Sequence, residues 1–372
     1  MSIDFMRKRL EALKTKLVES GLDAFLVTDI RNIRYLSGFT GSSAYLAVGR
    51  TSACLLTDSR YTLQAEEETR GSGIRLKIYK RRGLEEAARR LSSFVCSRVS
   101  SRARPSNAGF EGNVLSFDDF TRLKKSVKGA KLKSLPGIVR TLRRSKDVEE
   151  IKTIREAARI LDAGFAAAKR TLRPGISEGH VASIIEAAFK RNGAEGPAFE
   201  TIVASGMRSA LPHGRAGDKL LEKGEFVVID CGALLQGYNT DETRTFFVGR
   251  PGRLHKKVYQ AVLDGQTRAI EKIRPGVRAS RIDMAARGAI SAAGFGKYFV
   301  HSTGHGVGLD VHEPPVIGPK SKDVLEEGMV ITVEPGIYIP GWGGVRIEDM
   351  ALVTRSGFEL LTNSPRGLGL FD

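Results

Sequence analysis

Short apolar runs alternate with amphipathic stretches through the first part of the chain. Residues 1–20 predict an amphipathic helix, and helical patterns recur at 84–98 and 117–126. Apolar runs predict three strands, at 23–28, 44–49 and 53–58. The segment 29–43, between the first two runs, is rich in turn residues. This alternation predicts a small α/β domain.

A break at Pro136-Gly137 separates this part from a strongly helical pattern over 143–172. Ser145 or Asp147 is the expected helix cap, because acidic residues follow in the first turn. We therefore expect an N-terminal domain over 1–139 and a second domain over 140–372.

The second part contains an internal repeat. LRPGI at 172–176 returns as IRPGV at 273–277, and helical patterns precede and follow both copies. His213 and His312 lie downstream of the two copies. The repeat predicts duplicated α+β halves with a cleft between them, to which each half contributes a histidine.

Two acidic residues interrupt an apolar hairpin pattern over 225–249. Asp230 follows four apolar residues, and Asp241 comes 11 positions later on the returning arm. Either alone is explained by a turn cap. Both together favour a site, since Asp is depleted in strands and is rarely buried unless it is paired or bound to metal.

A second apolar hairpin pattern, over 327–354, repeats this arrangement. Glu334 ends one strand and Glu348 lies 14 residues later, again among apolar neighbours. A single buried Glu could pair with Arg346. Four embedded acids are harder to explain in this way, because an isolated buried carboxylate is very costly.

The stretch HSTGHGVGLDVHE, 301–313, holds three of the six histidines. His301 and His305 would share one face of a helix, but the glycines within the run each cost about 1 kcal/mol in a helix interior. We expect a glycine-rich loop that enters a short strand over 308–312. A solvated loop is the alternative.

Four carboxylates and His305 form a predicted set of metal ligands. Two divalent ions would offset four negative charges, and an oxygen-rich set with one imidazole suits manganese, cobalt or iron better than a thiolate-type structural zinc site. Two such ions can share a water and lower its pKa. The other histidines would then serve proton transfer and oxyanion contacts.

The net charge of +17 raises nucleic acid as a partner. Residues 1–150 hold 30 Lys and Arg against 17 Asp and Glu, whereas residues 151–372 hold 29 against 25. The basic runs carry almost no aromatic residues for base stacking, so no specific nucleic acid is expected.

The sequence contains no run of 18 apolar residues, so no membrane span is expected. The odd, scattered cysteines (Cys54, Cys96 and Cys231) suit small buried residues in a reducing cytoplasm.

The order of candidate ligands resembles a known family. The ligands follow the order Asp, Asp, His, Glu, Glu, in the contexts TDETRTF, STGHGVGLDVHE, VEPGIY and VRIED. This pattern resembles that of the metallopeptidases of family M24, which include methionine aminopeptidase, aminopeptidase P and prolidase. NIRYLSGFTGSSAYLAV with LLTDSRYTLQAEEE resembles the creatinase-type N-terminal domain of the Xaa-Pro branch. The resemblance implies an α+β pita-bread catalytic domain after a smaller α/β domain.

The resemblance also implies residue roles. Metal ligands would be Asp230, Asp241, His305, Glu334 and Glu348, with Glu348 bridging two ions. Glu334 would also help to deprotonate the shared water. His213 and His312 would contact the substrate amide and the tetrahedral intermediate. Substrate contacts would come from His301, in the proline pocket, and Arg346, while Thr243 would support a ligand. Arg208 replaces a common Asn, which puts local substrate contacts in doubt. His180 and His255 match nothing and are expected at the surface.

We therefore expect a cytoplasmic, metal-dependent Xaa-Pro peptidase with two divalent ions, manganese first and cobalt, zinc or iron as alternatives. An aminopeptidase P acting on the N-terminus of longer peptides is the main hypothesis, and a prolidase acting only on dipeptides is the alternative. A metal-free creatinase-like hydrolase and a non-enzymatic binding protein are further alternatives. The resemblance implies proline-containing peptides as substrates and a homodimer, with a tetramer left open.

Overall fold

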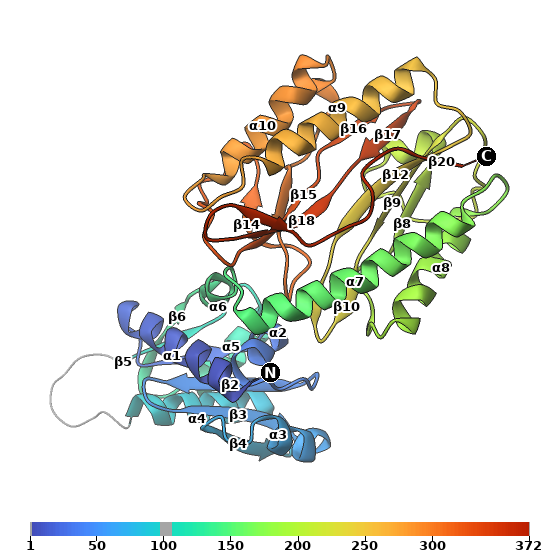
Figure 1. The fold of residues 1–372 in the computed structure, drawn as a ribbon. Coiled ribbons are helices and arrows are strands. Elements are labelled where there is room, and N and C mark those ends of the chain that lie inside the picture. Colours follow the sequence, from blue (N-terminus) through green and yellow to red (C-terminus); the bar gives the residue numbers. More distant parts are fainter. Residues whose placement is uncertain (1, 97–105, 372) are drawn as a thin grey trace. The chain divides into compact units, whose positions relative to one another are not determined.

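Two units make up the chain in the computed structural model, which describes residues 2–96 and 106–371 (Figure 1). They are Met1–Arg143 and Arg144–Asp372. The boundary drawn from the sequence lay between residues 139 and 140. The short helix α6 (Ile138–Leu142) lies in the first unit.

The first unit is built on a mixed sheet with the strand order β4-β3-β2-β1-β5-β6. Its strands are β1 Ala24–Val27, β2 Ala44–Gly49, β3 Ala53–Asp58, β4 Ile74–Tyr79, β5 Ser106–Phe110 and β6 Ala130–Ser134. Its helices are α1 Ile3–Glu19, α2 Ile30–Ser37, η1 Ser59–Tyr61, α3 Thr62–Glu68, α4 Gly83–Cys96, α5 Phe117–Ser126 and α6. The apolar side of α4 packs into one core with the central strands. The three predicted strands and the opening helix are confirmed, and residues 97–98 of the predicted 84–98 helix lie outside the described residues.

Part of the turn-rich segment 29–43 is helical. The side chain of Asp29 accepts the Arg31 N–H and so caps α2, and Gly38 ends the helix at φ 74°. Left-handed backbone at a helix C-terminus favours Gly. The turn residues of this segment are therefore the two caps of a short helix.

The second unit places helix pairs against small sheets. Its helices are α7 Val148–Thr171, α8 Glu178–Arg191, η2 Gly206–Ala210, α9 Arg253–Ile270, α10 Ala279–Ala292 and η3 Gly296–Tyr298. One sheet has the order β20-β12-β9-β8 and another β14-β13-β15-β18-β19. Smaller sheets are β11-β10-β7 and β16-β17. The strands are β7 Gly196–Pro197, β8 Ile202–Ser205, β9 Phe226–Cys231, β10 Ala233–Leu235, β11 Tyr238–Asn239, β12 Glu242–Val248, β13 Gly304–Gly306, β14 Glu313–Ile317, β15 Val330–Val333, β16 Gly336–Ile339, β17 Gly343–Arg346, β18 Asp349–Val353, β19 Phe358–Leu360 and β20 Gly369–Phe371.

The helix pairs α7–α8 and α9–α10 are the predicted repeat (Figure 1). In each pair the Arg-Pro-Gly turn joins the two helices. The N–H of Gly175 donates to Leu221 O at 2.9 Å, and that of Gly276 donates to Leu325 O at 2.9 Å. Both glycines have φ of 82°. The same turn with the same backbone contact in both halves confirms the duplicated fold. Asp147 caps α7 through a capping box, which decides between the two expected caps.

The predicted strand over 308–312 is wrong. Strand β13 covers Gly304–Gly306 and β14 begins at Glu313, with bends between them. A Cβ on Gly304 would lie 2.0 Å from Thr332 O, so this glycine permits close strand contact and does not form a loop.

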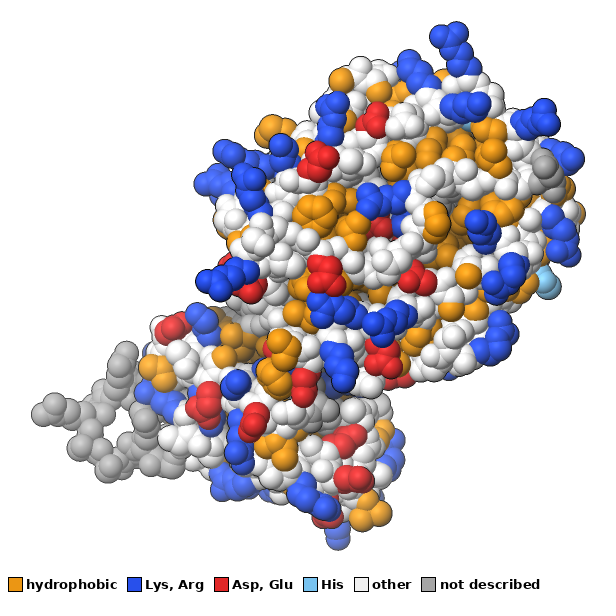
Figure 2. Space-filling model, in the orientation of Figure 1, with side chains coloured by type: hydrophobic (Ala, Val, Ile, Leu, Met, Phe, Trp, Pro, Cys, Tyr) orange, Lys and Arg blue, Asp and Glu red, His pale blue; other side chains and the backbone are white. Residues whose placement is uncertain are grey.

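Several smaller expectations meet the structure in this fold. Cys54 and Cys231 are free and buried, as expected, and the side chain of Cys96 lies outside what the structure describes. Over the described part of the chain, no helix combines the length and apolar character needed to cross a membrane. On the visible face, Lys and Arg side chains are spread among acidic and neutral ones (Figure 2).

Candidate metal centre

The first two predicted ligands are brought together by the pairing of β9 with β12. Asp230, near the end of β9, lies opposite Thr243 on β12. Asp241 directly precedes β12. The predicted hairpin over 225–249 is therefore present, with the short strands β10 and β11 inserted in its connection.

The second carboxylate pair follows the same logic. Glu334 directly follows β15 and Glu348 directly precedes β18, and these strands pair with Val333 opposite Asp349. The hairpin β16–β17 is inserted between them. His305 lies on β13, which pairs with β15. Strand pairing brings together two side chains in one sheet and three in another, and the hydrogen bond from Glu348 N–H to Thr243 O at 3.0 Å joins the two groups.

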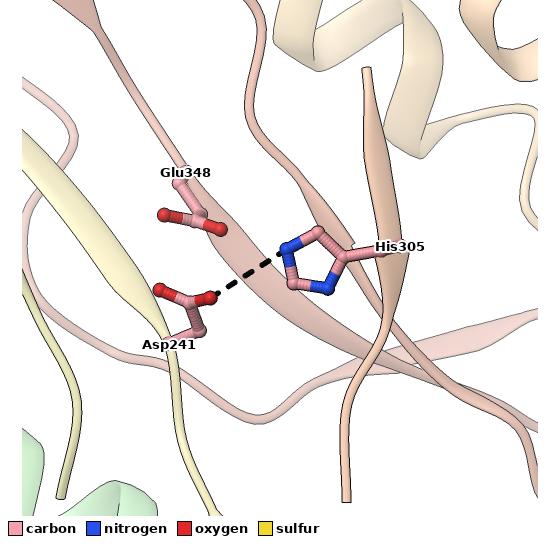
Figure 3. A group of neighbouring side chains, drawn as sticks. All are labelled: Asp241, His305 and Glu348. Atoms are coloured by element: carbon pink, nitrogen blue, oxygen red, sulfur yellow. Dashed lines mark ion pairs between the residues drawn. The ribbon is translucent and has the colours of Figure 1, made fainter. Parts of the chain in front are cut away.

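Asp241, His305 and Glu348 point toward one another (Figure 3). Each offers a ligand atom within 4.8 Å of the others. His305 Nε2 lies 3.6 Å from Asp241 Oδ2 and 3.5 Å from Glu334 Oε1. These separations exceed hydrogen-bond length and leave room for a cation between the groups.

The tautomer of His305 fits a metal ligand. Its Nδ1 lies 3.0 Å from Gly306 O, and a carbonyl oxygen only accepts, so Nδ1 carries the proton. Burial lowers the pKa of His305 to about 4, with His312 adding to the effect. The imidazole is therefore neutral at pH 7, and its Nε2 lone pair faces carboxylate oxygens. Such an arrangement is repulsive unless a cation lies between the groups or the carboxyl groups are protonated.

The carboxylates also require positive charge. Burial raises the pKa of Asp241 and of Glu348 well above the usual range, and neighbouring carboxylates raise both further. Burial raises the pKa of Glu334 to about 8. Within the described residues, the buried atoms Asp230 Oδ1 and Glu348 Oε1 have no hydrogen-bond partner. An oxygen-rich cluster with unpartnered buried oxygens fits divalent metal ions.

Arg346 borders the ligand cluster, and its side chain is buried, at 3 % exposed. Its Nη2 donates to Asp230 Oδ2 at 2.7 Å, and its Nε donates to Thr243 Oγ1 at 3.0 Å. Thr243 Oγ1 in turn donates to Glu348 Oε2 at 2.7 Å. Arg346 and Thr243 therefore hold two of the candidate ligands in place, each by a direct hydrogen bond.

His301 connects to the same arginine through Tyr338, a residue that the sequence analysis missed. Arg346 Nη1 donates to Tyr338 Oη at 2.8 Å, and Tyr338 Oη lies 3.0 Å from His301 Nε2. His301 Nδ1 lies 2.7 Å from Ser302 O and so carries the proton. Its Nε2 accepts the Tyr338 hydroxyl proton. Burial lowers the pKa of His301 to about 4, which keeps the ring neutral.

His312 and His213 lie near this group. The His312 ring centroid is 4.2 Å from that of His305. Burial lowers the pKa of His312, Asp230 opposes this, and the charge of His213 adds to the lowering. His213 is exposed on the loop after η2. Arg346 Nη1 also donates to Pro212 O at 3.0 Å, beside His213.

Four further ion pairs were not predicted from the sequence. Lys146 and Glu313 form a buried ion pair of 2.7 Å, next to His312. Arg244 pairs with Glu242 at 2.7 Å and Asp349 at 2.6 Å, on the residues next to Asp241 and Glu348. Arg208 pairs with Glu178. Glu242 and Arg244 lie two positions apart on β12 and therefore on the same face, and this spacing was the available signal for Arg244.

His180 lies at the surface, as expected, and His255 lies there only in part. His255 is half-buried, because its ring stacks on Trp342 with centroids 5.0 Å apart and an interplanar angle of 20°. Its Nδ1 also accepts the Gly252 N–H at 3.2 Å. The aromatic neighbours come from distant segments, so the sequence around His255 gave no sign of them.

Two known family profiles together match most of the chain. The profile of Metallopeptidase family M24 matches residues 152–355, and that of the Creatinase/Prolidase N-terminal domain matches residues 9–145. The chain belongs to metallopeptidase family M24. It is therefore an enzyme, a peptidase of the family with which its sequence was compared.

Several M24 relatives of named activity are similar to this chain over nearly its whole length. The Xaa-Pro dipeptidase of Pyrococcus horikoshii is 40% identical over 98% of this chain and 100% of its own length. The structure of the Xaa-Pro dipeptidase from Bacillus anthracis superposes with a TM-score of 0.93 at 38% identity, covering 98% of this chain and 99% of the other. The X-Pro aminopeptidase of Thermotoga maritima has a TM-score of 0.85 at 36% identity, covering 94% and 98%.

Proposed function

We propose that this M24 peptidase is an Xaa-Pro dipeptidase. The observation that carries the proposal is the cluster of four carboxylates and His305, with His213, His301 and His312 beside it. The choice of dipeptidase follows the relatives: two full-length matches at 40% identity bear that name. This revises the sequence-based hypothesis, which placed aminopeptidase P first and dipeptidase second.

Two divalent ions would be held by Asp230, Asp241, His305, Glu334 and Glu348. We propose manganese, because oxygen ligands dominate the set. When bound, such ions polarise the peptide carbonyl and make water a stronger nucleophile at neutral pH.

The chain's own residues would do the remaining work. Glu334 would accept the proton of the attacking water, since its carboxylate belongs to the ligand cluster. His312 and His213 would donate hydrogen bonds to the carbonyl oxygen as its charge grows. The Xaa-Pro bond is a tertiary amide, and its proline nitrogen must gain a proton before it can leave.

His301 would bind the proline ring, and Arg346 would hold Asp230 and Tyr338 in position. A neutral His301, fixed by Tyr338 and Ser302 O, offers a half-buried ring face and not a charge. We also infer a cytoplasmic homodimer. The three scattered cysteines support a reducing compartment, and the dimer rests on the family resemblance.

A hydrolysis panel with added Mn²⁺ or Co²⁺ tests the proposal. It compares Xaa-Pro dipeptides with Xaa-Pro-Xaa tripeptides and longer peptides, with Xaa-Ala peptides as controls. Cleavage of dipeptides alone is expected. Cleavage of the longer peptides would instead make the enzyme an aminopeptidase P, and no metal-dependent cleavage of any member would overturn both substrate assignments.

A further inference from the structure

The loop that carries His213 has little regular backbone structure. It follows η2, and residues 211–217 contain one isolated bridge, between Ile202 and Arg215. His213 itself is exposed. Few backbone hydrogen bonds hold this loop, among them Gly214 N–H to Leu211 O at 3.1 Å, so side-chain contacts matter for the position of the imidazole.

Three polar contacts hold this segment. Gly344 N–H donates to Ser209 Oγ at 2.8 Å, which ties η2 to β17. Arg346 donates to the carbonyl of Pro212, one residue before His213. Arg208 Nη2 donates to the carbonyl of Arg215, two residues after it. Two arginines thus hold the backbone on either side of His213.

Arg208 is in turn held by Glu178. The Glu178 side chain is fully buried at the first turn of α8, and its Oε1 accepts both the N–H and the hydroxyl of Ser205 at 2.8 Å. Its Oε2 pairs with Arg208 Nε at 3.1 Å. A buried carboxylate requires a counter-charge, and Arg208 supplies it. One face of the guanidinium therefore binds the interior while Nη2 reaches the loop.

We propose that Glu178 and Arg208 are positioning residues that fix the His213 loop for catalysis. The proposal rests on the role given to His213 in the proposed function. Without the pair, the loop after His213 would be held chiefly by backbone contacts, namely the Ile202–Arg215 bridge and the hydrogen bond from Gly179 N–H to Gly217 O at 2.8 Å, and His213 would occupy more than one position. A misplacement of about 1 Å can cost about a hundredfold in rate.

Arg208→Ala tests the proposal, and Arg215→Ala is the matched control. Arg215 lies on the same loop, but its side chain is 81% exposed and pairs with the exposed Glu200, while its carbonyl is kept in the variant. Both variants would be assayed as the full-length, metal-loaded enzyme for kcat, KM and metal content. Hydrogen exchange over residues 206–217 would be measured as well.

We expect Arg208→Ala to lower kcat/KM about ten- to a hundredfold, with metal content unchanged and faster exchange in the loop. Arg208→Lys should give an intermediate loss, because an ammonium cannot reach Glu178 and the Arg215 carbonyl with the geometry of a guanidinium fork. Arg215→Ala should stay within about twofold of the natural enzyme.

A double-mutant cycle separates positioning from general stability. If Arg208 acts through His213, the loss caused by Arg208→Ala should largely disappear in a His213→Ala background. Additive losses, or equal behaviour of Arg208→Ala and Arg215→Ala, would overturn the proposal. If the natural enzyme cleaves no Xaa-Pro peptide, the proposed function fails, and the exchange comparison alone still decides whether the pair fixes the loop.

Discussion

The Tyr338 hydroxyl occupies a position that only the folded chain reveals. It accepts from Arg346 and donates to His301, so it transmits the position of a buried cation to a neutral imidazole. The candidate ligands could be predicted from the sequence because acids inside apolar strands are rare. Tyr338 could not, since a tyrosine on an apolar strand is ordinary and its partners lie eight and 37 residues away.

Tyr338→Phe should lower kcat/KM about tenfold, because a hydrogen bond to a charged group contributes about 1.5–3 kcal/mol. Tyr259→Phe is the matched control. The Tyr259 side chain is also buried, and its hydroxyl donates to Arg366 O at 2.6 Å. Steady-state kinetics and thermal unfolding of both variants check the prediction. Similar stability losses with a kinetic loss confined to Tyr338→Phe are expected, and equal kinetics in both variants would contradict it.

His301 should make stability depend on pH. Its pKa falls from 6.5 to about 4 on folding, chiefly by burial, so the unfolded chain binds the proton first as pH drops. The contribution is complete above pH 6.5 and is lost as pH falls toward 4, by up to ~3 kcal/mol. In chelator-treated protein, the free energy of unfolding should therefore fall less between pH 7 and 5 in His301→Asn than in the natural chain. Parallel pH curves would show that the histidine does not contribute.

At the scale of elements, hydrophobic patterns predicted the long helices, three strands of the first unit and both site hairpins, but not the shorter strands or how they are inserted. Both site hairpins were expected, yet each holds a second small hairpin in its connection. The insertions β10–β11 and β16–β17 are short, and their pairing depends on contacts with residues outside the two hairpins. The strand expected over 308–312 lies earlier in the chain, because the glycines of β13 predict a loop where the structure has a strand.

Gly304 should tolerate no side chain. Its Cβ would meet Thr332 O at 2.0 Å, next to the candidate ligand His305, so Gly304→Ala should destabilise the protein by about 1–3 kcal/mol or more and weaken metal binding. Gly288→Ala is the opposite control: it lies exposed in α10 with nothing within 4 Å of a Cβ. That change should add about 0.5–1 kcal/mol. Chemical denaturation and metal titration measure both, and equal effects would contradict the close-contact argument.

At the scale of the whole molecule, the repeat predicted the duplicated halves, and the candidate ligands come from both. Asp230 and Asp241 belong to the first half and the other three to the second. The order of residues in the sequence predicted which side chains are candidate ligands. The convergence of these side chains depends on sheets that pack only in the complete second unit.

Metal removal should therefore destabilise the protein in a pH-dependent way. Burial raises the pKa of Glu334 from 4.5 to about 8, so the folded metal-free state holds a proton that the unfolded chain has released. The contribution of Glu334 to the stability of the metal-free protein is therefore lost as pH rises through 8. The gap in Tm between Mn²⁺-loaded and chelator-treated protein should widen from pH 6.5 to 8.5, with protons released on binding. Calorimetry in two buffers measures the release, and a gap that stays constant or narrows would contradict the prediction.

The separation of the candidate ligands along the chain has a consequence for biosynthesis. Asp230 precedes Glu348 by 118 positions. At roughly 5–20 residues per second, on the order of 6 to 24 s pass between their additions to the growing polypeptide. During that interval the first two carboxylates lack the strands that complete their surroundings, including the Thr243–Glu348 and Arg244–Asp349 contacts. Metal loading must then follow the synthesis of the second half, and a prematurely terminated chain would carry an acidic, incomplete site that cannot mature.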